Sequence, residues 1–159
     1  MTDSADLLRD PEFPADALLD LDGLTDLLGF HLRLAHVAMY RDFAVAMAAL
    51  DLTQKQCATL QLIGANSGVS QVDLAATLGT DRATMMAMID RLEQRDLVVR
   101  RRSVSDRRRQ ELSLTQAGEA ILKQARRTIA EHERHFTARF TAAELKTLVN
   151  ALSRIHRQV

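Results

Sequence analysis

The sequence contains little of the material from which disulfide scaffolds, zinc sites and aromatic binding platforms are built. Its 159 residues include one cysteine, no tryptophan, one tyrosine, two prolines and six glycines. The single cysteine, Cys57, cannot form an internal disulfide or supply a zinc framework of cysteines. Aromatic residues make up 4% of the chain, which disfavours a β-sandwich or a carbohydrate-binding platform. Few prolines and glycines, among many leucines and alanines, predict a mostly helical fold.

Long apolar runs are also missing. No stretch of 18 apolar residues occurs, so we expect no membrane-spanning segment and no membrane partner. The first residues are acidic, and no apolar segment follows a basic start, so we expect no secretion signal. These features favour a cytoplasmic location. The length suits one domain, or one domain with a dimerisation extension, and it allows a core without covalent cross-links.

Charge is balanced in total but unevenly distributed along the chain. There are 21 basic and 21 acidic residues. Residues 1–29 carry eight acids and one base, whereas residues 91–109 carry eight arginines and three acids. The arginine cluster is a candidate contact for a polyanion, although a run of charge often forms only a solvated face.

Hydrophobic spacing predicts helices and a hairpin in the order α-α-α-α-β-β-α-α. After an acidic lead-in over residues 1–14, apolar residues recur at helical spacing up to Leu50, as one helix or two. Further helices are expected at about 82–95 and 116–139. Residues of the types that cap helix N-termini mark the expected starts, with an acid three residues after Ser70 and after Thr141 as in capping boxes: Thr53, Ser70, Thr80 or Asp81, Thr115 and Thr141.

Near Leu97 the apolar period changes from helical to alternating. Leu97-Val98-Val99 is short and partly β-branched, and Leu112 and Leu114 alternate with polar residues. The intervening residues 100–109 are rich in arginine. Two short strands around a polar, basic tip predict a β-hairpin.

Two short helices joined by a tight turn and followed by a basic hairpin describe a winged helix-turn-helix, expected here at residues 52–115. The second helix of such a pair can lie in the major groove of DNA, with its N-terminal side chains facing base edges. Arginines of the hairpin suit phosphates and a narrow minor groove. The predicted DNA contacts are Arg82, Thr84, Met85, Arg91, Arg101, Arg102, Arg107, Arg108 and Arg109.

The methionines of the second helix have two interpretations. Met85 and Met88 share helical spacing with Ile89 and Leu92, which is typical of a core stripe. For Met88 we favour the core. For Met85 we favour the face toward DNA, where its side chain would pack on thymine methyl groups.

Five stretches of the sequence in one order resemble the MarR family of bacterial transcriptional regulators. They are LTQKQ (52–56), SQVDLAATLG (70–79), DRATMMAMIDRLEQRDLVVRR (81–101), SDRR (105–108) and LSLTQAG (112–118), within a similarity that covers about residues 24–159. The resemblance implies a homodimer whose N-terminal and last two helices intertwine, so residues 15–51 and 116–159 would form the dimerisation region. It implies binding to a pseudo-palindromic double-stranded DNA operator.

The resemblance also assigns roles in the hairpin, called the wing in this family. Asp106 would buttress the wing and Arg108 would enter the minor groove. The chain departs from the family at Asp96, where a glycine usually follows the recognition helix. A left-handed backbone there would be less unfavourable for Asp than for most other non-glycine residues.

The ends of the chain give a physical reason for dimerisation. Leu145, Leu148, Leu152 and Ile155 form an apolar stripe near the C-terminus, with too little chain left to cover it. A second copy is the natural cover. A two-fold dimer would present two recognition helices about one DNA turn apart, roughly 34–36 Å.

Many MarR-type proteins release DNA when a small aromatic acid or phenol binds, so the resemblance implies a repressor with such an effector. The candidate binding residues all belong to the first long helix. Imidazole, phenol and guanidinium groups there could hold a ring and a carboxylate. The same residues could instead belong only to the surface or to a dimer interface: His31, Arg33, His36, Tyr40 and Arg41.

Other functions receive weaker support from the sequence. Cys57 would be the only thiol available to a redox-responsive regulator of the same fold, and an apolar setting favours simple packing. His132 and His135 stand three apart on a helix but form no metal site by themselves. No phosphate loop, dinucleotide fingerprint or hydrolase motif is present, so we expect neither an enzyme nor a cofactor. A winged-helix module that binds protein rather than DNA stays an alternative.

Overall fold

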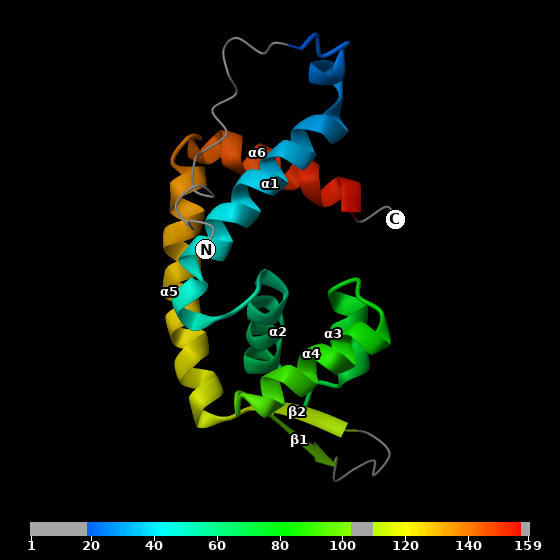
Figure 1. Cartoon of the computed structure of the whole chain (residues 1–159), viewed down its shortest axis with the longest axis vertical. Coiled ribbons are helices and arrows are strands. Elements are labelled where there is room, and N and C mark those ends of the chain that lie inside the picture. The colour runs from blue at the N-terminus through cyan, green and yellow to red at the C-terminus, as the bar shows by residue number, and fades with distance from the viewer. Residues whose placement is uncertain (1–18, 103–109, 157–159) are drawn as a thin grey trace, which may run out of the picture. The chain divides into compact units, whose positions relative to one another are not determined.

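The computed structural model describes residues 19–102 and 110–156 (Figure 1). The chain forms two compact units, Met1–Asp42 and Phe43–Val159. Helix α1, Leu28–Ala46, is a single α-helix between two short 3-10 helices, Leu24–Asp26 and Ala48–Leu50. The apolar N-terminal region therefore forms one long helix within the described residues.

Three helices follow: α2 (Gln54–Ala65), α3 (Gln71–Thr77) and α4 (Arg82–Gln94). Thr53 and Ser70 begin the first two with complete capping boxes, in which Gln56 and Asp73 are the reciprocal partners. Asp81, not Thr80, is the N-cap of α4. These caps satisfy backbone N–H groups that have no partner within the helix, which fixes where each helix begins.

The predicted hairpin is present. Strand β1, Val98–Arg102, pairs antiparallel with β2, Gln110–Leu114, and the register sets Arg100 opposite Leu112 and Arg101 opposite Glu111. Asp96 joins α4 to β1 with φ 55°, in the left-handed region. The N–H of Leu97 bonds to the carbonyl of Leu92, and that of Asp96 to Glu93, which is the Schellman pattern of a helix end.

Two further helices complete the chain: α5 (Gln116–Thr137) and α6 (Ala142–His156). Thr115 caps α5 by accepting a hydrogen bond from the Gly118 N–H. At the start of α6 the Thr141 N–H donates to Glu144 Oε2 and the Glu144 N–H donates to the Thr141 hydroxyl, which is a capping box. The predicted starts are confirmed, and α5 ends two residues earlier than expected.

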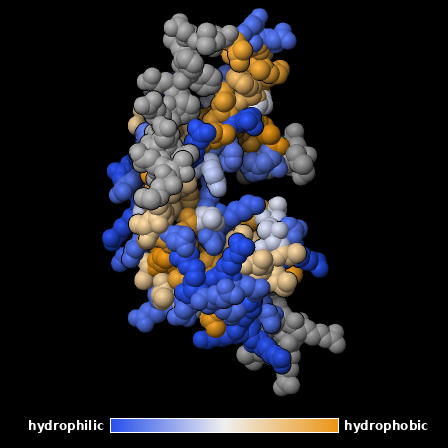
Figure 2. All heavy atoms as spheres, in the orientation of Figure 1, coloured by the Kyte–Doolittle hydropathy of each residue, from blue (hydrophilic) through white to orange (hydrophobic). Residues whose placement is uncertain are grey.

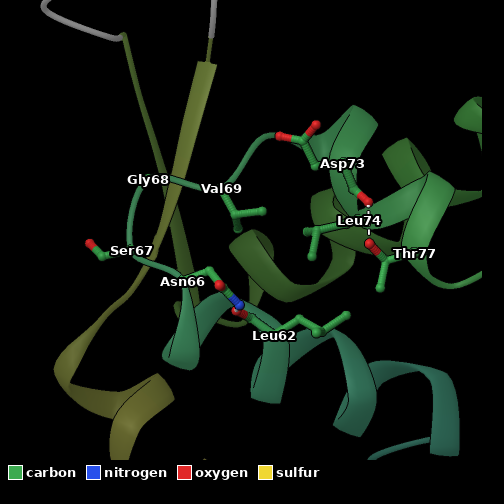
Figure 3. Close-up of a pocket in the computed structure, with 8 residues that line it drawn as sticks. All are labelled: Leu62, Asn66, Ser67, Gly68, Val69, Asp73, Leu74 and Thr77. Atoms are coloured by element: carbon green, nitrogen blue, oxygen red, sulfur yellow. Dashed lines mark hydrogen bonds between the residues drawn. The ribbon is translucent and has the colours of Figure 1, made fainter.

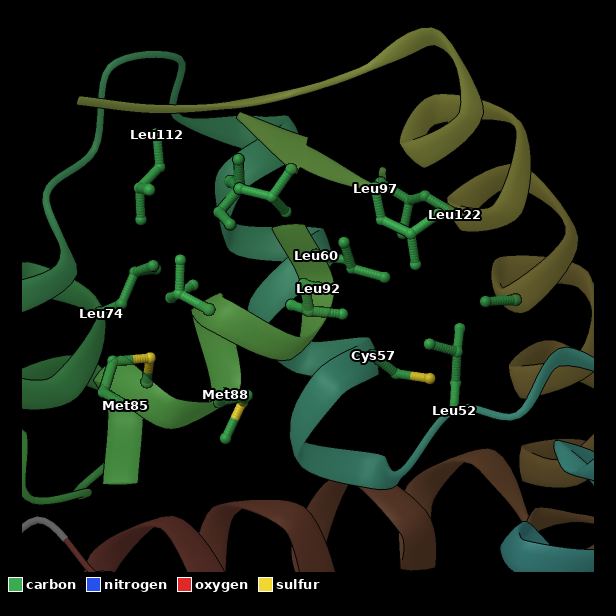
Figure 4. Packing of buried hydrophobic residues seen from close by; sticks show 14 of the residues in the cluster. Leu52, Cys57, Leu60, Leu74, Met85, Met88, Leu92, Leu97, Leu112 and Leu122 are labelled. Atoms are coloured by element: carbon green, nitrogen blue, oxygen red, sulfur yellow. The ribbon is translucent and has the colours of Figure 1, made fainter. Parts of the chain in front are cut away.

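A continuous apolar core lies in the unit Phe43–Val159 (Figure 4). Helices α2, α3, α4 and the hairpin contribute most of it, and α5 adds Leu122 and Ala125. Met88 is 9% exposed, which confirms its predicted place in the core. No helix in the described part of the chain is long and apolar enough to span a membrane.

Large apolar side chains also remain at the surface. Leu27 and Leu28, at the beginning of α1, are 55% and 62% exposed, and orange side chains gather over this region in Figure 2. Helix α6 contains no buried residue, and Leu148, Val149 and Ile155 are exposed. Exposed apolar faces of this kind are typical of surfaces that take part in interactions.

Candidate nucleic-acid interface

The N-terminus of α4 presents polar side chains around its cap. The Thr84 N–H donates to Asp81 Oδ1 at 2.9 Å, and the Thr84 hydroxyl donates to Asp81 Oδ2 at 2.6 Å. These bonds from Thr84 lower the pKa of Asp81, so its carboxylate stays ionised at neutral pH. Arg82 follows directly and is exposed. The start of α4 therefore offers the guanidinium of an exposed arginine and a hydroxyl oriented by the N-cap residue Asp81.

The predicted DNA contact of Met85 is wrong. Its side chain is 0% exposed and lies among the packed residues of the core (Figure 4). Met85 begins an i, i+3, i+4, i+7 stripe with Met88, Ile89 and Leu92, and that stripe faces inward along its whole length. Met86, the next residue, is 51% exposed and is a large apolar side chain on the outer side of α4.

The predicted contacts of the hairpin fall partly within the described residues. Arg101 and Arg102 are both exposed. Successive residues of a strand face opposite sides, so Arg102 shares a face with Arg100, and Arg101 shares one with Glu111. Asp106, Arg107, Arg108 and Arg109 lie outside the described residues. On α4, Arg91 is exposed and stands seven residues after Thr84, on the same side of the helix.

Two arginines that the sequence analysis left without a role connect α4 to its surroundings. Arg100 of β1 forms ion pairs with Asp90 and Glu93 of α4. Arg95, at the end of α4, donates to the carbonyl of Leu50 at 2.9 Å and to that of Asp51. The sequence contained a signal for the Arg100 ion pairs: two acids three residues apart on a predicted helix, followed by an arginine on the next strand.

The five predicted effector residues are not all on one side of α1. At 100° per residue, Arg33, His36, Tyr40 and Arg41 lie within about half the circumference, whereas His31 is opposite Tyr40. The rings of His36 and Tyr40 are 6.0 Å apart between centroids. His31 Nε2 instead lies 2.7 Å from the Thr25 carbonyl oxygen, where it ties the preceding 3-10 helix to α1.

A hollow of about 490 Å³ lies between the end of α2, the turn after it and α3 (Figure 3). Three of the polar side chains that line it have hydrogen-bond partners. Asn66 donates to the Leu62 carbonyl at 2.9 Å, Thr77 donates to the Asp73 carbonyl at 2.8 Å, and Asp73 accepts from the Ser70 hydroxyl at 2.7 Å. None of the predicted effector residues lines this hollow.

Cys57 and His132 are core residues. Cys57 is 2% exposed, and burial raises the pKa of its thiol to about 11, so it is neutral and poorly nucleophilic near pH 7. His132 is 4% exposed, with its ring edge-on to Phe43 at 5.4 Å and to Phe136 at 5.2 Å. Over residues 19–102 and 110–156, no group of three or more metal-ligating side chains is brought together.

A helix pair whose second member starts with an exposed arginine, beside a basic two-stranded wing, defines a winged helix-turn-helix protein. The family model described as MarR family matches residues 52–109. A putative transcriptional regulatory protein for the hcr operon of Thauera aromatica is 36% identical over 132 residues, which are 82% of this chain and 80% of that protein.

Two solved structures of the transcriptional repressor CouR are similar over most of the chain. CouR bound to a 23-mer DNA duplex is 38% identical with a TM-score of 0.83, covering 87% of this chain and 98% of that one. CouR bound to p-coumaroyl-CoA is 35% identical with a TM-score of 0.80, and the match covers 89% of this chain and 99% of that one. The chain belongs to the MarR family and is a transcriptional regulator; the relatives named here are regulators rather than enzymes.

Proposed function

We propose that this protein is a homodimeric repressor that binds a pseudo-palindromic operator and leaves it when an aromatic effector binds. The observation that carries the DNA-binding part is the pairing of Arg82 and Thr84 at the start of α4 with exposed Arg101 and Arg102 on β1. A chain of 38% identity, CouR, has been solved with a DNA duplex bound.

On DNA, α4 would lie in the major groove. Arg82 and Thr84 would meet base edges or phosphates, and Arg91 a phosphate further along the helix. The strand arginines Arg101 and Arg102 would contact the backbone. At the wing tip, Arg107, Arg108 and Arg109 would enter or flank the minor groove, with Asp106 as their buttress.

Dimerisation would cover the apolar surfaces that one copy leaves exposed. The faces of α6 and of the start of α1 carry Leu148, Val149, Leu27 and Leu28, all more than a third exposed. Residues 15–51 and 116–159 would form this interface, and a two-fold axis through it would pair two copies of α4 with two half-sites.

The effector would be an aromatic acid, a phenol or a thioester of an aromatic acid. Helix α1 supplies the groups for it: Arg33 and Arg41 for a carboxylate or phosphate, and the neighbouring rings of His36 and Tyr40 for stacking. CouR with p-coumaroyl-CoA bound supports an aromatic acyl thioester as one candidate. His31, held by the Thr25 carbonyl on the opposite face, would contribute least.

DNA binding is tested on duplexes selected from a random pool by the protein itself. Fluorescence anisotropy should show a selected duplex bound tightly, with affinity falling steeply as salt rises, because several phosphates are neutralised. Arg108→Ala should weaken binding by about 1–3 kcal/mol. Arg127→Ala, which removes the same charge from the exposed side of α5, is the control. A selection that enriches no duplex, or binding without salt dependence, would favour the protein-interaction module.

The effector is tested by release of the bound duplex. p-Coumaric acid, p-coumaroyl-CoA and coenzyme A alone separate recognition of the aromatic group from recognition of the nucleotide. His36→Ala and Tyr40→Phe should reduce release without changing DNA affinity, and His31→Ala should change neither. Equal release of the duplex from the wild type, His36→Ala and Tyr40→Phe would place the effector site away from these α1 residues. The dimer is tested separately by light scattering, and a monomer mass would refute it.

A further inference from the structure

Arg100 occupies a different place from its neighbours in the basic run. It lies opposite the buried Leu112 in the hairpin register, on the strand face that carries the buried Val98. Its side chain is only 18% exposed, whereas Arg101 and Arg102 are exposed. The strand alternation therefore turns Arg100 inward, toward α4, which packs on β1.

The residues that receive Arg100 belong to the second half of α4. Asp90 and Glu93 are three apart and so lie on one side of the helix. One terminal nitrogen of Arg100 pairs with Asp90 and the other with Glu93. The Arg100 backbone N–H also donates to Glu93 Oε1 at 3.3 Å. A forked guanidinium that holds two carboxylates fixes both distance and orientation.

The charges of this cluster indicate what it does. Two carboxylates face one guanidinium, so Arg100 is more than neutralised and has no charge left for a phosphate. Two acids this close to a DNA-binding surface would by themselves repel the polyanion. Their presence is explained if they contribute geometry rather than charge.

The geometry matters because the tether acts at the end of α4 opposite Arg82. Eleven residues separate Glu93 from Arg82, which is about 16 Å along the helix axis. A tilt of about 4° around the tether would move Arg82 by about 1 Å, enough to break a hydrogen bond to a base edge.

We infer that Arg100, with Asp90 and Glu93, is a positioning device that sets the angle between the recognition helix and the wing, and so determines operator selectivity. This inference rests on the proposed DNA-binding function. Arg100 acts through the two carboxylates and does not itself contact DNA. Arg101 and Arg102, on the same strand, keep their direct roles.

The test compares three variants on the selected operator and on an unrelated duplex of equal length. Arg100→Ala removes the guanidinium, Asp90→Ala with Glu93→Ala removes both acids, and the triple variant removes everything. Each should lower the ratio of operator affinity to unrelated-duplex affinity about tenfold, because the general effect of the changed charge acts on both duplexes and cancels in the ratio. The triple variant should lower this ratio no more than the others. Arg100→Lys, which keeps the charge without the fork, should recover part of the loss.

The sign of the effect decides between explanations. If Arg100 contacted phosphate directly, removal of the two acids would free it and strengthen binding to both duplexes, and the ratio of the two affinities would stay at the wild-type value. If the cluster only braced the fold, the variants would melt earlier but bind with the wild-type dissociation constant per folded molecule. Either result overturns the inference, and the proposed function stands as long as the wild type binds its selected duplex. A wild type that binds no selected duplex refutes the proposed function, and the inference with it.

Discussion

Gly118, in the first turn of α5, is where the smallest substitution should do the most damage. A Cβ at this position would lie 1.9 Å from the carbonyl oxygen of Leu97 and 2.9 Å from its carbonyl carbon. Both are backbone atoms, so no side chain can rotate out of the way. A carbon–oxygen contact needs about 3.3 Å, so α5 would have to move by about 1.4 Å.

That movement disturbs the junction between the hairpin and α5. The Thr115 N–H donates to the Leu97 carbonyl at 3.2 Å, and the Gly118 N–H donates to the Thr115 hydroxyl at 2.9 Å. Overpacking accounts for about 1–3 kcal/mol, and the weakened cap and hydrogen bond for about 1 kcal/mol each. Alanine's helix preference returns about 1 kcal/mol. Gly118→Ala should therefore lower the free energy of unfolding by about 2–4 kcal/mol.

The assay is thermal unfolding followed by far-UV circular dichroism at one fixed protein concentration. A loss of about 3 kcal/mol corresponds to a fall in Tm of about 6–12 °C in a chain of this length. Gly64→Ala is the matched control, because its Cβ would meet only the side-chain ends of Leu122 and Leu114, at 2.9 and 3.0 Å. If both variants melt within about 2 °C of each other, the close approach of α5 to Leu97 is refuted.

Three more predictions test other local features. The raised pKa of Cys57 means that folding disfavours its thiolate, so the contribution of the neutral thiol to stability is complete below pH 9 and is lost between pH 9 and 11. Urea melts across this pH range should show the loss in the wild type and not in Cys57→Ala. Asp81 has a lowered pKa, so the contribution of its carboxylate to stability is present above pH 3.8 and is lost as the pH falls through the pKa of the folded state. Asp81→Ala should lower the Tm at pH 7 and flatten this acid dependence, and an unchanged Tm would contradict the role of Asp81 as the N-cap. Asp96→Gly should stabilise the chain by about 0.5–1 kcal/mol in the same melts, because glycine adopts a φ of 55° without steric strain, and a loss would contradict the left-handed helix end.

Features determined by neighbours in sequence were predictable. The capping boxes at Ser70 and Thr141 depend on a partner three residues away, so the sequence contains the whole interaction. The left-handed turn at Asp96 could be anticipated from the family resemblance, and its φ of 55° confirms it.

Features determined by contacts between elements were not predictable in the same way. Met85 is as apolar as an exposed groove contact would be, and only the packing of α4 on the core decides that it is buried. Arg100 reads as one more arginine in a basic run until the hairpin register turns it toward Asp90 and Glu93. By contrast, the separation of His31 from Tyr40 on α1 was predictable, because it follows from the number of residues between them.

Tyr40 gives the protein an unusual spectroscopic property. It is the one tyrosine in a sequence without tryptophan, and it lies on α1 in the unit Met1–Asp42, whereas the core cluster belongs to Phe43–Val159. Intrinsic tyrosine emission therefore reports on the surroundings of Tyr40 on α1. Melting curves from emission and from circular dichroism will coincide only if the two units unfold together.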